Sequence, residues 1–258
     1  MLGGVKLKDG DLCKECKKKL SPFFDDGKES TVDDIKKQIE SRDENYTKLD
    51  TLEINKIYGE FGVILIDEKN EKFVAVKDTS DSLFGSSKVV NGIEDVKDKN
   101  PDIIDFKDVE DVEIKIIETS REEKQTLNGE QVSYDPKHYT YMISFDVIIK
   151  VNHPYIRLMR ISLKQGTIQI YNEGRRLKDD YITGFVKEKI GLQRVENKAV
   201  HYDNLTIHNL VENAMQIMPE YAYGFKCTLK NYDSIKEYAY YLALCDEIKT
   251  TLLNYKGG

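Results

Sequence analysis

The chain has 258 residues, 40% of them hydrophobic and 33% charged, with a formal net charge of −7 at pH 7. A chain of this length can bury enough surface to fold without disulfides, and its apolar content argues against global disorder. The acidic balance means that only a local basic patch could bind nucleic acid or anionic lipid. No apolar run reaches the roughly 20 residues of a membrane-spanning helix, and residues 1–4 open no signal peptide, so we expect a cytosolic protein.

The first 45 residues predict a small head followed by a linker helix. Residues 6–16 are typical of a short strand, an Asp-Gly turn and a knuckle that carries two cysteines. Ser30 and Thr31 offer hydroxyl N-caps, acidic residues follow them, and apolar residues then recur at helical spacing to about Arg42. One amphipathic helix should therefore follow the head.

Residues 50–258 predict a second, β-rich domain. Short runs rich in Val, Ile, Phe and Tyr lie between polar turns with no helical pattern between them, which favours an antiparallel sandwich or curled barrel over a parallel sheet. Residues 67–71 form the loop of one expected hairpin, and Asn128-Gly129 marks a later turn. The predicted strands are residues 61–66, 72–76, 112–117, 139–149, 155–161 and 166–171.

Two further segments complete this expected domain, and the predicted fold class is α+β. Residues 172–230 read as an insertion, with a helix that begins near Asp203 and ends at Pro219. Residues 233–254 predict a long C-terminal helix, because apolar residues recur there at steps of three and four and must lie against another surface. The recurring residues are Tyr238, Tyr241, Cys245, Ile248, Leu252 and Tyr255.

Cys13 and Cys16 are the strongest chemical signal in the sequence. Two thiols separated by two residues on a turn can chelate one Zn²⁺, although a structural zinc site normally has four ligands. Cys227 and Cys245 lie far apart and form no second pair of this kind. Incidental thiols and a redox pair are the alternatives, and the redox use is disfavoured because the βαβ context is absent. We therefore predict that Cys13 and Cys16 form half of a zinc site.

Residues 5–24, with residues 30–36 after them, resemble a bacterial domain family of unknown function whose head is a four-cysteine zinc ribbon. In that family one Cys-x-x-Cys pair precedes a Lys-Leu-Lys-Asp-Gly strand and a second pair follows it, so Cys13 and Cys16 match the second pair. The resemblance implies either that the first pair would lie before Met1 or that this member has lost zinc. It also implies a pleckstrin-homology-like layout for the β-rich domain, in which the C-terminal helix closes one end of a curled barrel.

No motif in the sequence predicts an enzyme. Residues 84–88 lack the first glycine and the Gly-Lys-Ser/Thr order of a phosphate loop. His201 and His208 lie two helical turns apart without a third metal ligand nearby. The acidic hairpin loop at residues 67–71 argues against a lipid phosphate ligand. We therefore expect a non-enzymatic binding or adaptor module, with another protein as its partner and its oligomeric state left open.

A cluster of arginines supports an alternative function. Arg157, Arg160, Arg175 and Arg176 lie close enough in the sequence to predict a patch that could bind nucleic acid or a phosphate ligand. The net charge of −7 weakens this alternative, because the field of the whole molecule repels polyanions.

Overall fold

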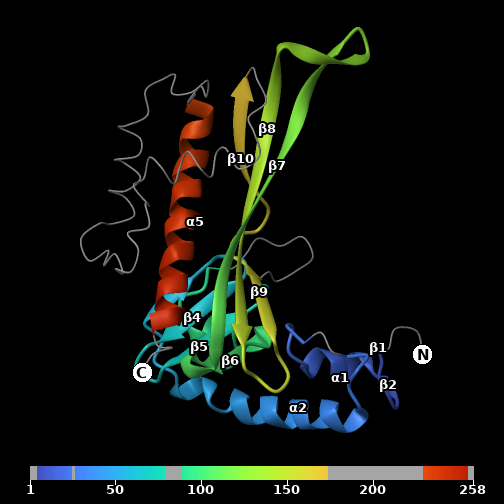
Figure 1. Ribbon diagram of the computed structural model, residues 1–258, viewed down its shortest axis with the longest axis vertical. Helices are drawn as coiled ribbons and strands as arrows, with labels where there is room; N and C mark the ends of the chain where they lie inside the picture. The colour runs from blue at the N-terminus through green and yellow to red at the C-terminus, as the bar shows by residue number, and fades with distance from the viewer. Residues whose placement is uncertain (1–4, 25–26, 80–88, 174–228, 255–258) are drawn as a thin grey trace. The chain divides into compact units, whose positions relative to one another are not determined.

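The computed structural model describes residues 5–24, 27–79, 89–173 and 229–254. The chain divides into two compact units. Unit 1 contains Met1–Lys115, Asp146–Gln165 and Ile248–Gly258, and unit 2 contains Ile116–Phe145 and Gly166–Glu247. Helices and antiparallel strands make up the described residues (Figure 1), so the predicted α+β class is confirmed. The predicted division of the chain near residues 45–50 stays a prediction.

The head consists of a small hairpin and a short helix beside α2 (Figure 1). β1 (Val5–Lys6) pairs antiparallel with β2 (Asp11–Leu12), and α1 (Lys14–Lys19) follows β2. α2 (Val32–Tyr46) begins where the sequence predicts, because Thr31 Oγ1 accepts the Asp34 N–H and the Asp34 carboxylate accepts the Thr31 N–H. The head and α2 share a small core of Leu7, Leu12, Leu20 and Ile35.

The first sheet belongs to unit 1 and is antiparallel throughout. Its strand order is β3 (Lys56–Tyr58), β4 (Val63–Asp67), β5 (Lys72–Val76) and β6 (Asp102–Asp105). The hairpin predicted around residues 67–71 is confirmed, with a loop one residue shorter than predicted, because Asp67 belongs to β4 and pairs with Lys72. All five residues of β4 are buried. Four short 3-10 helices accompany this sheet, namely η1 (Leu49–Thr51), η2 (Ile93–Asp95), η3 (Lys97–Lys99) and η4 (Phe106–Asp108).

The second sheet is built on a long hairpin. β7 (Val109–Leu127) and β8 (Glu130–Val151) flank the predicted Asn128-Gly129 turn, where φ is 52° and 85°. Both values are positive, as a two-residue hairpin turn of this kind requires. β9 (Leu158–Ser162) pairs with the C-terminal part of β8, and β10 (Ile168–Glu173) pairs with an earlier part of it.

The strands do not close into a barrel. The described strands form two separate four-stranded sheets and the β1–β2 hairpin. η4 separates β6 from β7, and β7 pairs with β8 instead of extending the first sheet. The barrel expectation is therefore not met in the described part of the chain, and the pleckstrin-homology-like layout is not confirmed. Residues 174–228, which hold most of the predicted insertion and its helix, lie outside the described residues.

The long C-terminal helix is confirmed as α5 (Leu229–Asn254). Its predicted apolar face is buried at Tyr238, Tyr241, Cys245, Ile248 and Leu252. Within unit 2, the rings of Tyr238 and Tyr241 lie 5.2 and 5.7 Å from the ring of Phe145 on β8. Within unit 1, Thr251 Oγ1 lies 3.4 Å from the hydroxyl of Tyr58 on β3. None of the helices in the described ranges combines the length and apolar character needed to cross a membrane.

The contact of α5 with Phe145 predicts a large stability effect. Tyr241→Ala is expected to lower the free energy of unfolding by about 3–5 kcal/mol, because it removes a buried ring that stacks on Phe145. Asp246→Ala changes an exposed position of the same helix and should have little effect. Urea titrations of the two variants measure the difference. Equal, small losses would show that this face of α5 is not core.

Candidate functional site

The two cysteines predicted as metal ligands lie at the start of α1. Cys13 is the N-cap, and its Sγ accepts the backbone N–H of Cys16 at 3.2 Å. This hydrogen bond lowers the pKa of the Cys13 thiol, whereas the neighbouring Cys13 sulfur raises the pKa of Cys16. Cys13 is exposed, and Cys16 is half-buried against the core of the head. Cys13 is therefore the thiol of the pair that ionises first.

Cys13 and Cys16 could supply two ligands to a metal ion. Both thiols lie on one exposed turn with a backbone N–H bonded to one sulfur, the arrangement that zinc knuckles use. Among the described residues, no group of three or more His, Cys, Asp or Glu side chains could hold a metal ion. Cys227, His201 and His208 lie outside the described ranges.

Only two of the four arginines of the predicted patch belong to the described residues. Arg157 and Arg160 line one groove, whereas Arg175 and Arg176 fall outside the described residues. Arg160 on β9 donates from Nε to Asp146 Oδ2 on β8 at 2.8 Å, and Nη2 bonds to the same oxygen. The Asp146 carboxylate is buried and also accepts the Ser162 hydroxyl at 2.6 Å. The charge of Arg160, whose side chain is half-exposed, is therefore offset in part by a buried carboxylate.

The groove that contains Arg157 and Arg160 also carries apolar side chains that sequence reasoning missed. Leu158 is 45% exposed at the start of β9. The Lys77 ammonium lies 5.8 Å from the centre of the Phe23 ring and donates to the Pro22 carbonyl at 3.0 Å. The groove has a volume of about 390 Å³. Its described lining is Pro22, Phe23, Phe24, Lys77, Tyr155, Arg157, Leu158 and Arg160.

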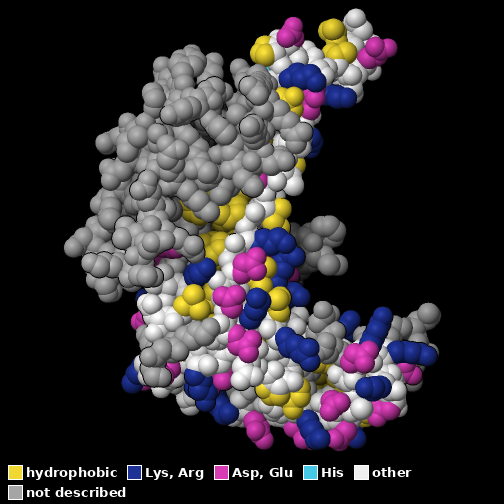
Figure 2. Space-filling view, viewed as in Figure 1, with side chains coloured by type: hydrophobic (Ala, Val, Ile, Leu, Met, Phe, Trp, Pro, Cys, Tyr) yellow, Lys and Arg dark blue, Asp and Glu magenta, His cyan; other side chains and the backbone are white. Residues whose placement is uncertain are grey.

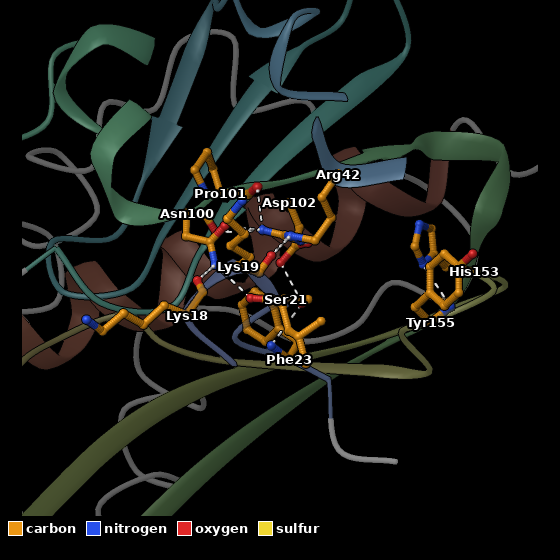
Figure 3. A network of polar contacts seen from close by, with 11 residues as sticks. Lys18, Lys19, Ser21, Phe23, Arg42, Asn100, Pro101, Asp102, His153 and Tyr155 are labelled. Carbon is orange, nitrogen blue, oxygen red and sulfur yellow. Dashed lines mark hydrogen bonds and ion pairs between the residues drawn. The ribbon is translucent and has the colours of Figure 1, made fainter. Parts of the chain in front are cut away.

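A second hollow of unit 1, here called the cleft, is organised around Arg42 of α2. Figure 3 shows side chains and carbonyls from the end of α1 and from residues 100–102 that converge on the Arg42 guanidinium. Its Nε donates to the Lys19 carbonyl at 3.0 Å, and Nη2 donates to Asn100 Oδ1 at 2.6 Å. Its Nη1 forms an ion pair with Asp102, whose second oxygen accepts the Ser21 hydroxyl at 2.8 Å. The ion pair thus joins the head, α2 and the start of β6.

This ion pair is buried but fully hydrogen-bonded. The side chains of Arg42 and Asp102 are 13% and 4% exposed. Burial lowers the pKa of Arg42 to about 10, and the nearby Asp43 charge opposes that effect, so the guanidinium is still a cation at pH 7. A buried charge that loses its partner is strongly destabilising, because the remaining ion has neither water nor a counter-charge.

The walls of the cleft combine apolar and polar groups. It has a volume of about 220 Å³ and is bordered by Gln38, Leu49, Ile103, His153 and Tyr155, together with the Arg42 network. The Tyr155 N–H donates to His153 Nδ1 at 3.3 Å, so the neutral ring carries its proton on Nε2. Burial lowers the pKa of His153, although Asp108 opposes this shift. His153 is therefore mainly uncharged at pH 7.

The Arg42 network predicts an asymmetry between two aspartates. Asp102→Asn should lower the free energy of unfolding by about 3–5 kcal/mol, because Arg42 would stay buried without a counter-charge. Asp33→Asn removes the exposed partner of Lys37 on the same helix and should cost almost nothing. Urea unfolding of both variants measures the difference. If Asp102→Asn costs no more than Asp33→Asn, the ion pair does not hold the head to the sheet.

Comparisons with known proteins reach only the head. Residues 1–38 match a family model described as a domain of unknown function (DUF4428). No curated protein and no solved structure matches the chain. The match confirms the resemblance of the head to a domain family of unknown function, and the zinc ribbon and the pleckstrin-homology-like region stay predictions.

Proposed function

We propose that this chain is a non-enzymatic binding module and that its ligand is another protein, held in the groove of unit 1. The observation that carries the proposal is the composition of that groove. Exposed Leu158 lies there beside the aromatic rings of Phe24 and Tyr155 and the side chain of Arg157. Aromatic residues and arginine around an apolar centre are typical of protein interfaces and supply most of their binding energy.

The charges of the groove favour an acidic partner. Lys77, Arg157 and Arg160 are basic, and none of the other described residues that line the groove is acidic. The ion pair with Asp146 offsets part of the charge of Arg160, so the preference for an acidic partner is a modest one. A protein segment that carries acidic and apolar side chains complements this surface, and opposite charges at the rim of an interface also speed association.

Nucleic acid is the weaker alternative. A nucleic-acid site needs a stripe of unpaired basic residues that follows the phosphate backbone. Figure 2 instead shows Lys and Arg side chains interspersed with Asp and Glu around the head and α2 in the face in view. The net charge of −7 adds a repulsive field.

For the head, we propose that Cys13 and Cys16 supply half of a zinc site. The N–H bond to Cys13 Sγ and the exposure of the turn support this proposal, because zinc binds the thiolate and needs access to it. The remaining ligands would come from a second copy of the chain. Zinc thiolates persist where thiols stay reduced, so the proposed compartment is the cytosol.

The protein partner can be tested with two matched leucines. Leu158→Asp places a negative charge in the groove and should reduce recovery of the partner at least tenfold in affinity purification from cells. Leu127→Asp makes the same change at an exposed position at the tip of the β7–β8 hairpin and should leave recovery unchanged. Quantitative mass spectrometry of nuclease-treated samples measures the ratio.

Two outcomes would contradict the proposed protein partner. One is recovery of the same proteins by both leucine variants, which would remove the groove from the interaction. The other is recovery of nucleic acid from parallel samples without nuclease, with binding that falls steeply with salt and is lost on Arg157→Glu, since each phosphate contact contributes about −0.7 to −0.9 to the slope of log affinity against log salt. That result would favour the nucleic-acid alternative.

The zinc proposal predicts incomplete metal binding by this chain. Elemental analysis of the purified protein should give less than one tightly bound zinc per chain, or one zinc shared by two chains in native mass spectrometry. Cys13→Ser should abolish that zinc, and Cys245→Ser, which changes a buried cysteine of α5, should not. One tight zinc on each monomeric chain would contradict the half-site and direct attention to Cys227, His201 and His208.

A further inference from the structure

Gln38 is a buried polar side chain of the cleft whose hydrogen-bonding groups are not satisfied by the described residues. It lies on α2 between Ile35 and Ile39, which belong to the apolar core of the head. The residue is 1% exposed and borders the cleft. Neither atom of its carboxamide has a hydrogen-bond partner among the described residues. Because a buried amide without a partner is costly, such a group in a native protein calls for an explanation.

The chemistry of a carboxamide restricts the group that would complete it. Gln38 offers N–H donors and a carbonyl acceptor side by side. Another amide presents the matching acceptor and donor, so a peptide main chain can satisfy both functions at once. A carboxylate or a phosphodiester only accepts hydrogen bonds and would leave the Gln38 carbonyl without a donor.

The charges around Gln38 also disfavour an anion. Arg42 is paired with Asp102, Lys97 with Asp50 and Glu94, and Lys18 with Glu15. Lys19 also lines the cleft, but so do the acidic Asp43 and Asp98. The uncharged His153 and the apolar side chains of Leu49 and Ile103 form other parts of the wall. A nearly neutral ligand with polar main-chain groups suits these walls better than a polyphosphate does. The volume of about 220 Å³ greatly exceeds the space that one water needs, about 10–15 Å³.

We propose that the cleft binds an extended peptide segment, one main-chain amide of which pairs with the carboxamide of Gln38. This inference rests on the proposed function, since the segment would belong to the protein partner. Tyr155 supports the link, because it lines both the cleft and the groove. A single extended segment can therefore place apolar and acidic side chains in the groove and its main chain in the cleft.

The test uses acetyl-alanine N-methylamide, a small probe with two peptide groups, and the whole chain labelled at isoleucine methyl groups and glutamine amides. The probe should shift the Ile103 and Ile156 methyl signals, which report on the cleft wall, and the Gln38 amide signal, with saturation at millimolar concentrations. Gln38→Met should weaken the methyl response at least tenfold. Gln169→Met, an exposed position on β10, should not change it.

Gln38→Met is also informative about folding. Replacing an unpartnered buried amide by an apolar side chain of similar size should leave stability unchanged or raise it. A loss of stability would show that Gln38 is bonded within the fold and would overturn the proposal. An unchanged probe response in Gln38→Met would also overturn it, as would methyl shifts caused by inorganic phosphate or acetate but not by the diamide.

The leucine experiment separates this inference from the proposed function. A partner that is lost with Leu158→Asp but bound equally by wild type and Gln38→Met would support the groove and overturn the peptide cleft. Loss of the same partner in both variants, with Gln169→Met unaffected, would support the single extended segment.

Discussion

The buried ion pair between Arg42 and Asp102 is the constraint on which unit 1 depends. The head has a small core of four buried apolar side chains, and polar contacts join it to the rest of unit 1. Arg42 adds to these contacts because its planar guanidinium reaches the Lys19 carbonyl, Asn100 and Asp102 at the same time. The positions of α1, α2 and β6 are therefore set together, and the walls of both hollows follow from them.

Much of the local structure follows from the sequence. The cap at Thr31, the loop after Asp67 and the Asn128-Gly129 turn are short-range features with specific hydrogen-bonding or φ requirements, and each lies where predicted. The pairing of strands was harder to predict. β7 and β8 extend beyond the predicted strands at residues 112–117 and 139–149. Pairing between the two strands of the hairpin keeps the polar residues near the turn in strand conformation, which their own propensities do not predict.

One part of the candidate site could be predicted from the sequence and the other could not. The spacing of Cys13 and Cys16 identifies the knuckle directly, since a turn brings both thiols together. The cleft could not be predicted, because its walls come from α2, from the segment before β6 and from the segment that follows β8. One signal was present in the sequence. Gln38 interrupts the apolar face that Ile35 and Ile39 define, and a polar residue on a buried helix face indicates a specific hydrogen-bonding role.

The buried side of α2 also has a thermodynamic consequence. Val32, Ile35 and Ile39 pack in the core of the head together with Cys16, while Gln38 and Arg42 on the same side of the helix border the cleft. A group that tightens the turn at Cys16 and a segment that occupies the cleft would act on the same helix. By thermodynamic linkage, if the first group changes the affinity for the second by some factor, the second changes the affinity for the first by the same factor. If zinc and a partner segment bind as proposed, each would change the affinity of the chain for the other through α2 by the same factor.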